Sequence, residues 1–61
     1  MRIWLKDLRI AKKLTMKEVA TSANISESFY SQIENGTRNP AVEVAKGIAT
    51  ALDFSWTKFF E

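Results

Sequence analysis

The sequence predicts a single all-α domain, and three observations support this fold class. The chain has 61 residues, which is room for one domain. Hydrophobic residues make up 46% of it, including two Trp and four Phe, so there is enough apolar material for one compact core. Apolar residues recur at helical spacing between breaks at Gly36 and Pro40, and no segment alternates as a strand does. We therefore expect five short helices in one domain over residues 1–61.

The first helix is predicted over residues 3–12, and the second begins at a capping sequence. The apolar stripe of the first helix consists of Trp4, Leu5, Leu8 and Ala11. Thr15 and Glu18 have the spacing of a capping box, in which each side chain accepts a hydrogen bond from the backbone N–H of the other residue. We expect the second helix to run from residue 16 to about residue 23, with an inward face of Val19, Ala20 and Ala23.

The third helix is predicted over residues 27–35, between a polar cap and a glycine. Asn24 tolerates the left-handed conformation and can therefore end the second helix and turn the chain. Ser26 is placed to cap the third helix at its N-terminus, and Gly36 is placed to end it in a left-handed conformation. The buried stripe is expected to comprise Ile25, Tyr30 and Ile33.

Two further helices are predicted in the last third of the chain. Pro40 suits the start of the fourth helix, which continues to about Leu52. Gly47 lies inside that helix, where a Gly lowers helix stability by about 1 kcal/mol relative to Ala. We expect that the missing side chain allows a neighbouring helix to pack closely there. The apolar residues of this helix are Val42, Val44, Ala45, Ile48, Ala49 and Leu52. Ser55 is the predicted N-cap of a last short helix that ends near residue 60.

The composition argues against several classes of protein. There is no Cys and no His, so disulfides, thiolate metal sites and the commonest general base are absent. We accordingly expect no metal, no cofactor and no enzymatic activity. No apolar run approaches the roughly 18 residues that a membrane span needs, and charges interrupt the apolar residues of the N-terminus, unlike in a signal peptide. We expect a cytoplasmic protein.

The charge is distributed unevenly along the chain. Residues 1–17 carry six Lys and Arg against one Asp, whereas residues 18–61 carry three Lys and Arg against six Asp and Glu. One interpretation is an ordinary solvated face. The other is a basic end of the molecule that meets nucleic acid phosphates.

The most informative segment spans residues 16–35, where a tight turn joins two short helices. Ala20 lies where these helices would cross, and a small side chain there permits a close approach. Such a unit sets its helices at a steep angle and leaves the outer face of the second helix clear. A helix presented in this way fits a major groove roughly 12 Å wide.

The chain resembles the Cro/CI-type, or XRE-type, helix-turn-helix family of phage and bacterial regulators. The most specific runs are Ser31-Gln32-Ile33-Glu34-Asn35-Gly36 and Arg38-Asn39-Pro40, and matching residues extend over nearly the whole chain. The resemblance implies a lambda-repressor-like fold that binds double-stranded DNA. It also implies a partly buried ion pair between Arg9 and Glu34. Four positions depart from the family pattern. Met16 replaces a Gln that touches phosphate, and Ala41 replaces a common Ser, which predicts a poorly capped fourth helix. Asn24 replaces the usual turn Gly, and Glu27 is acidic at a position that resembles a base-reading site.

The candidate DNA-contacting residues fall into two groups. Those that would read base edges lie on the outward face of the third helix: Glu27, Ser28, Ser31 and Gln32. Those that would contact the DNA backbone lie around the ends of the second and third helices: Lys17, Asn35, Arg38 and Asn39. The alternative for each residue is a polar solvated surface or loop.

We expect a sequence-specific DNA-binding transcriptional regulator, most naturally a repressor, that reads the major groove with helix 27–35. The alternative is a protein-interaction module on the same fold, such as an antirepressor, an antitoxin or a coactivator-like adaptor. A homodimer on DNA is expected through the C-terminal helix, with Trp56 or Phe60 as the contact, although the simpler role for the terminal aromatic residues is core packing.

Overall fold

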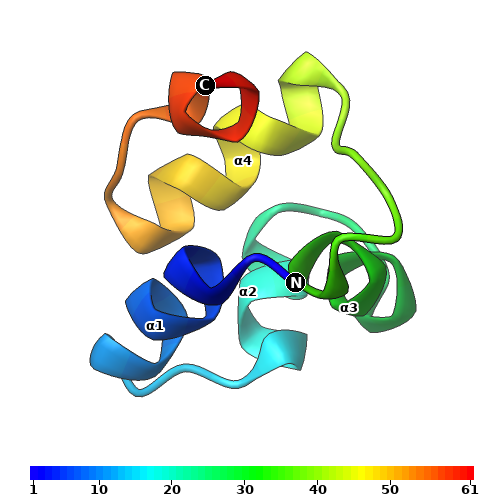
Figure 1. Ribbon diagram of the computed structural model, residues 1–61. Coiled ribbons are helices and arrows are strands. Elements are labelled where there is room, and N and C mark those ends of the chain that lie inside the picture. Colours follow the sequence, from blue (N-terminus) through cyan, green and yellow to red (C-terminus); the bar gives the residue numbers. More distant parts are fainter.

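The computed structural model describes all 61 residues and contains only helices (Figure 1). Four are α-helices and the last is a 3-10 helix, in the order α1 (Ile3–Ala11), α2 (Met16–Ser22), α3 (Glu27–Asn35), α4 (Val42–Leu52) and η1 (Trp56–Phe60). The prediction of an all-α fold with five short helices is confirmed. None of the helices combines the length and the hydropathy that a membrane crossing needs.

Local capping sequences determine where α2 and α3 begin. The Thr15 N–H donates to Glu18 Oε1 at 2.8 Å, and the Glu18 N–H donates to Thr15 Oγ1 at 3.1 Å, which completes the predicted capping box. The Ser26 hydroxyl accepts from the Phe29 N–H at 3.0 Å. Gly36 ends α3 with φ of 85°, and Asn24 makes the turn after α2 with φ of 60°. These four sequence predictions are confirmed.

The predicted start of α4 is wrong in detail, whereas η1 begins directly after Ser55, as predicted. Pro40 lies two residues ahead of α4 and is buried, so it belongs to the preceding loop and does not start the helix. Ala41 is the N-cap residue and makes no side-chain capping bond, as its replacement of Ser predicts. The Ser55 hydroxyl lies 2.8 Å from the Thr57 hydroxyl and does not cap η1.

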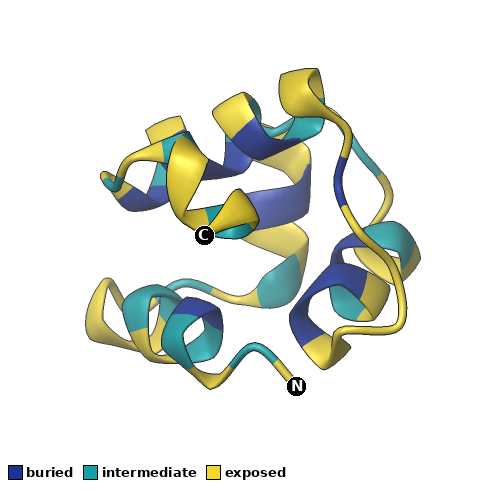
Figure 2. Ribbon diagram, turned by 45° about the horizontal axis from the view of Figure 1, so that its top comes forward, coloured by how far each residue is buried: buried dark blue, intermediate teal, exposed yellow.

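Every α-helix contributes to one core between the helices. Figure 2 shows the buried residues on the inward sides of the ribbons. The largest group of buried apolar side chains comprises Leu5, Val19, Ala20, Tyr30, Ile33, Ile48 and Leu52. Two predicted core residues are wrong: Ala11 is exposed at the last turn of α1, and Val42 is 47% exposed at the first turn of α4.

The Gly47 position brings α4 very close to the end of α2. A Cβ atom built on Gly47 would lie 3.3 Å from both the Cα and the Cβ of Ala23. That separation is tighter than an ordinary van der Waals contact between carbon atoms. The prediction that Gly47 permits close helix packing is confirmed.

A buried ion pair fixes α3 against α1. Arg9 Nε donates to Glu34 Oε2 at 2.9 Å, and Arg9 Nη2 donates to Glu34 Oε1 at 3.2 Å. Arg9 Nη1 also donates to the carbonyl oxygen of Leu14 at 2.9 Å, so the same guanidinium holds the turn before α2. Glu34 is completely buried, and its hydrogen bonds with Arg9 raise the pKa of the guanidinium. This pair, implied by the family resemblance, holds the helix that carries the candidate DNA-reading residues.

Candidate nucleic-acid interface

The outer face of α3 carries the four predicted base-reading residues. Glu27, Ser28 and Gln32 are exposed, and Ser31 is half-buried. The opposite face of the same helix is fully buried through Tyr30, Ile33 and Glu34. The inner face therefore fixes the rotation of α3, which leaves a polar stripe directed outward, as the helical spacing predicts (Figure 2).

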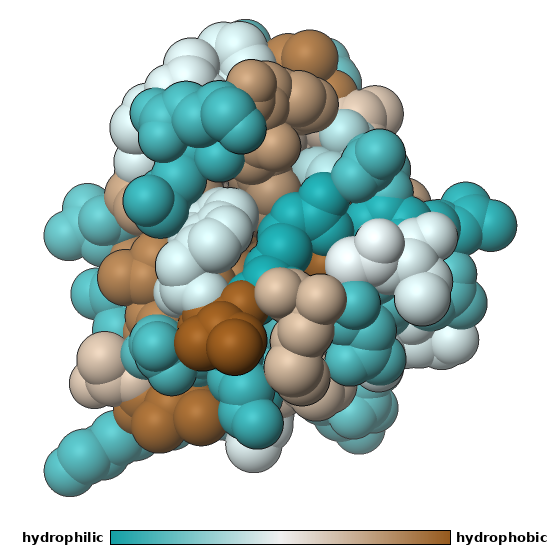
Figure 3. All heavy atoms as spheres, viewed as in Figure 1, coloured by the Kyte–Doolittle hydropathy of each residue, from teal (hydrophilic) through white to brown (hydrophobic).

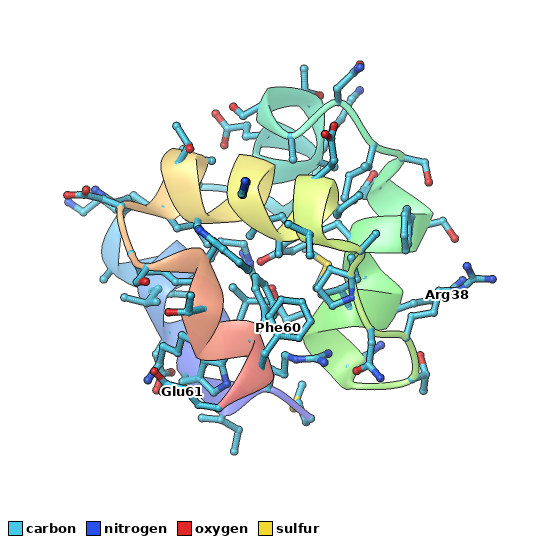
Figure 4. The ribbon with its side chains drawn as sticks, turned by 90° about the horizontal axis from the view of Figure 1, so that it is seen from above. Arg38, Phe60 and Glu61 are labelled. Atoms are coloured by element: carbon cyan, nitrogen blue, oxygen red, sulfur yellow. The ribbon has the colours of Figure 1, made fainter.

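The loop after α3 presents two of the predicted phosphate-contacting residues. Arg38 and Asn39 are both exposed. The backbone N–H groups of Thr37 and Arg38 donate to the carbonyl oxygen of Gln32 at 3.0 and 3.3 Å, so the loop turns back along the helix. The Arg38 guanidinium carbon lies 5.5 Å from the centre of the Phe29 ring, and Figure 4 shows this side chain extending outward beside α3.

Arg2 organises this loop, and the sequence analysis did not identify it as a site residue. Its backbone N–H donates to the carbonyl oxygen of Glu34 at 2.8 Å. Its guanidinium donates to the carbonyl oxygens of Ile33 and Arg38 at 2.5 and 3.1 Å, and to Asn39 Oδ1 at 2.6 Å. These partners lie 31 to 37 residues away in the sequence, so no local spacing could reveal them.

The remaining residues that were predicted to contact the DNA backbone are exposed and lie at helix ends. Lys17 is in the first turn of α2, and Asn35 is the last residue of α3. Met16, at the position where the family often has Gln, is half-buried and packs against the core. Its side chain thus serves packing in place of a polar contact.

The aromatic residues at the two chain ends form two groups. Trp4, Phe54 and Phe59 are half-buried, with ring centres 5.2 to 5.6 Å apart, and pack against the core. Trp56 and Phe60 form an edge-to-face pair with ring centres 6.0 Å apart, and this pair adjoins the first group because the ring centres of Phe59 and Phe60 lie 6.5 Å apart. Phe60 is 53% exposed, and Figure 4 shows it on the C-terminal segment beside Glu61.

The surface outside α3 and its loop shows no site for a small molecule or a metal ion. The surface has no pocket, and no three side chains of metal-binding type converge. On the face seen in Figure 3, apolar side chains are separated by hydrophilic ones and do not form one continuous patch. The candidate interface is the exposed face of α3 together with the polar loop that follows it.

Comparison with known proteins links this architecture to transcriptional regulators. A family model described as helix-turn-helix matches residues 5–59. An uncharacterized HTH-type transcriptional regulator of Bacillus subtilis, YqaF, is 52% identical over 61 residues, which cover all of this chain and 80% of that protein. The transcriptional regulator ClgR of Mycobacterium tuberculosis is 38% identical over 48 residues, which cover 79% of this chain and 43% of that protein.

A phage protein extends the comparison. The immunity repressor protein of Bacillus phage phi105 is 35% identical over 48 residues, which cover 79% of this chain and 33% of the repressor. The matched segment thus spans less than half of ClgR and of the phage repressor. No solved structure gives a significant match.

Proposed function

Because the chain belongs to the helix-turn-helix family of DNA-binding transcriptional regulators, we propose that it is a repressor that reads the major groove with α3. The observation that carries this proposal is the fixed orientation of α3. Its inner face is buried and paired to α1, while Glu27, Ser28 and Gln32 project outward. The resemblance to a phage immunity repressor supports repression as the regulatory outcome.

Each outward side chain of α3 suits a particular base edge. The Gln32 amide can donate and accept at once, which matches the N6 and N7 atoms of adenine. The hydroxyls of Ser28 and Ser31 can serve as donor or acceptor. Glu27 lies in the first turn of α3, where the helix dipole favours its negative charge, and its carboxylate can accept from N4 of cytosine.

The surrounding polar residues suit contact with the DNA backbone. Arg38 and Asn39 on the loop, Asn35 at the end of α3 and Lys17 at the start of α2 are all exposed. Contacts of this type fix the docking of the protein and read no sequence. Binding should therefore contain a strong electrostatic part that all duplexes share.

A homodimer on DNA is the assembly that this small domain needs. One domain on one half-site makes few phosphate contacts, so its affinity is modest. Two copies related by two-fold symmetry would occupy half-sites about one helical turn apart. The half-exposed Phe60, with Trp56 beside it, is the proposed contact between the copies. A repressor of this type acts on DNA in the bacterial cytoplasm.

Selection of bound sequences from random DNA, followed by salt titration, tests this proposal. Gln32→Ala should lose about 1–3 kcal/mol of discrimination at one base pair and keep its affinity for unrelated DNA. Arg38→Ala should instead weaken binding to every duplex alike and reduce the salt dependence by about one phosphate. Each variant is thus the control for the other. A parent protein that binds no duplex at low salt would favour a protein-interaction module.

A further inference from the structure

The guanidinium of Arg2 determines how the Asn39 amide is oriented. A guanidinium donates hydrogen bonds and accepts none. Asn39 must therefore turn Oδ1 toward Arg2, and the 2.6 Å contact joins these two groups. Because the amide is planar, its nitrogen then points away from Arg2. No group of the protein accepts a hydrogen bond from that nitrogen, and Asn39 is exposed. The two N–H donors of Asn39 thus face solvent.

The charge of Arg2 also remains uncompensated by any carboxylate. The salt bridge in the structure joins Arg9 to Glu34 and does not include Arg2. The partners of the Arg2 guanidinium are two backbone carbonyl oxygens and one amide oxygen, and its carbon lies 5.6 Å from the centre of the Phe59 ring. A net positive charge therefore persists beneath the loop, where it attracts anions.

We propose that Arg2 is a positioning residue for DNA binding. It holds the loop after α3 so that the amide nitrogen of Asn39 donates to a DNA phosphate. This inference rests on the proposed function, because it assigns a partner to a residue already placed at the DNA backbone. It adds a residue from the N-terminal segment, far from α3 in sequence, whose effect on DNA passes through Asn39.

A double-mutant cycle between Arg2 and Asn39 tests the proposal. The full chain is titrated with two probes, the duplex recovered by selection and an unrelated duplex of equal length, both at low salt. Asn39→Ala should lower affinity about tenfold on both duplexes, the loss expected for one hydrogen bond to a charged group. Arg2→Lys keeps the charge but loses the planar fork of donors, and should lower affinity about threefold to tenfold. In the Asn39→Ala background, Arg2→Lys should have no further effect.

Two aspartate variants separate the donor from the acceptor of Asn39. Asn39→Asp keeps an oxygen for Arg2 and turns that hydrogen bond into an ion pair, so the free energy of unfolding should stay equal or rise. It removes the N–H donors, so affinity should fall more than tenfold on both duplexes. Ala41→Asp adds the same charge two residues away on an exposed position and should weaken binding less.

Three results would overturn the assignment. One is an Asn39→Ala variant that binds as tightly as the parent. Another is an Arg2→Lys effect of equal size in both backgrounds, since Arg2 would then act independently of Asn39. The third is an Asn39 side-chain amide signal, followed by nuclear magnetic resonance in the parent, that does not move when the unrelated duplex is added. A parent that binds neither duplex removes the proposed function itself, and this inference with it.

Discussion

At the scale of single residues, Tyr30 contains an unusual buried group. Its hydroxyl is the one buried side-chain polar atom without a well-formed hydrogen bond, although it lies close to the Arg9–Glu34 ion pair. Burial is the main cause that raises the pKa of Tyr30, and the neighbouring Glu34 carboxylate adds to it. A buried hydroxyl without a partner costs about 1–3 kcal/mol. The core therefore tolerates this group at the expense of stability.

Tyr30→Phe should raise the free energy of unfolding by about 1 kcal/mol, because it removes an unpaired polar atom and keeps the ring. The gain should grow at alkaline pH. The unfolded tyrosine ionises near pH 10, whereas the folded one resists ionisation, so the parent loses stability as the pH rises above 10. Denaturant unfolding at several pH values measures both effects. An ultraviolet titration in which the single tyrosine of the folded parent ionises normally would contradict this account.

The sequence predicts well whether a side chain is buried or exposed where the spacing along one helix determines it. Helical spacing placed Glu27, Ser28 and Gln32 on the outside of α3 because the same spacing put Tyr30 and Ile33 inside. It could not identify Arg2, whose role depends on a loop more than thirty residues away. Long-range polar contacts of this kind follow no period.

At the scale of elements, the helices differ in whether a side chain accepts a hydrogen bond from the free backbone N–H groups of the first turn. α2 has only seven residues and is far too short to be stable alone, yet it has a complete capping box. α4 has eleven residues and no capping side chain. Its N-cap residue Ala41 has φ of −67° and ψ of 163°, close to the −73° and 153° of the capping residue Ser26. The backbone of α4 is thus already shaped for a cap.

Ala41→Ser should raise the free energy of unfolding by about 1 kcal/mol, since its hydroxyl can accept from an unsatisfied N–H in the first turn of α4. Ala41→Val is the matched control: it adds a branched side chain without an acceptor for the first turn and should not give this gain. Thermal or denaturant unfolding measures the difference. A Ser variant no more stable than the parent would mean that water already satisfies this turn.

The ends of the helices were harder to predict than the helices themselves. Pro40 has the chemistry of a first helical residue, but it is buried in the loop and α4 begins two residues later. Ser55 has the chemistry of an N-cap, but its hydroxyl pairs with that of Thr57 in a tighter 3-10 turn. Pro40 is buried and Ser55 has a nearer hydrogen-bond partner, so neither takes the role that its local chemistry favours.

At the scale of the whole molecule, the small size of the domain limits what one copy can do. Its total accessible surface is 3892 Å². A standard protein interface takes roughly 800 Å² from each partner, so α3 and a dimer contact together would occupy a large share of this surface. A contact between copies at the exposed Phe60 must therefore leave the outer face of α3 free for DNA.

Phe60→Ser should reduce the cooperativity of binding to a palindromic site more than it reduces affinity for one half-site. Phe60 is 53% exposed, so its loss should change the free energy of unfolding little. Phe59→Ser is the contrasting variant, because Phe59 packs against Trp4 and should destabilise the fold. Titration of duplexes with one and two half-sites measures cooperativity. Cooperativity that survives Phe60→Ser in a folded protein would place the contact between copies elsewhere.

The Arg2 contacts also have a consequence for the order in which the molecule assembles. The caps of α2 and α3 join residues three positions apart, whereas the Arg2 bonds close a segment of 31 to 37 residues. Closing a longer segment costs more chain entropy, so the caps can form early and the loop is fastened late. Exposed contacts of this kind also open before the core does. On warming, affinity for DNA should therefore decline through fraying of this loop while the helices are still intact.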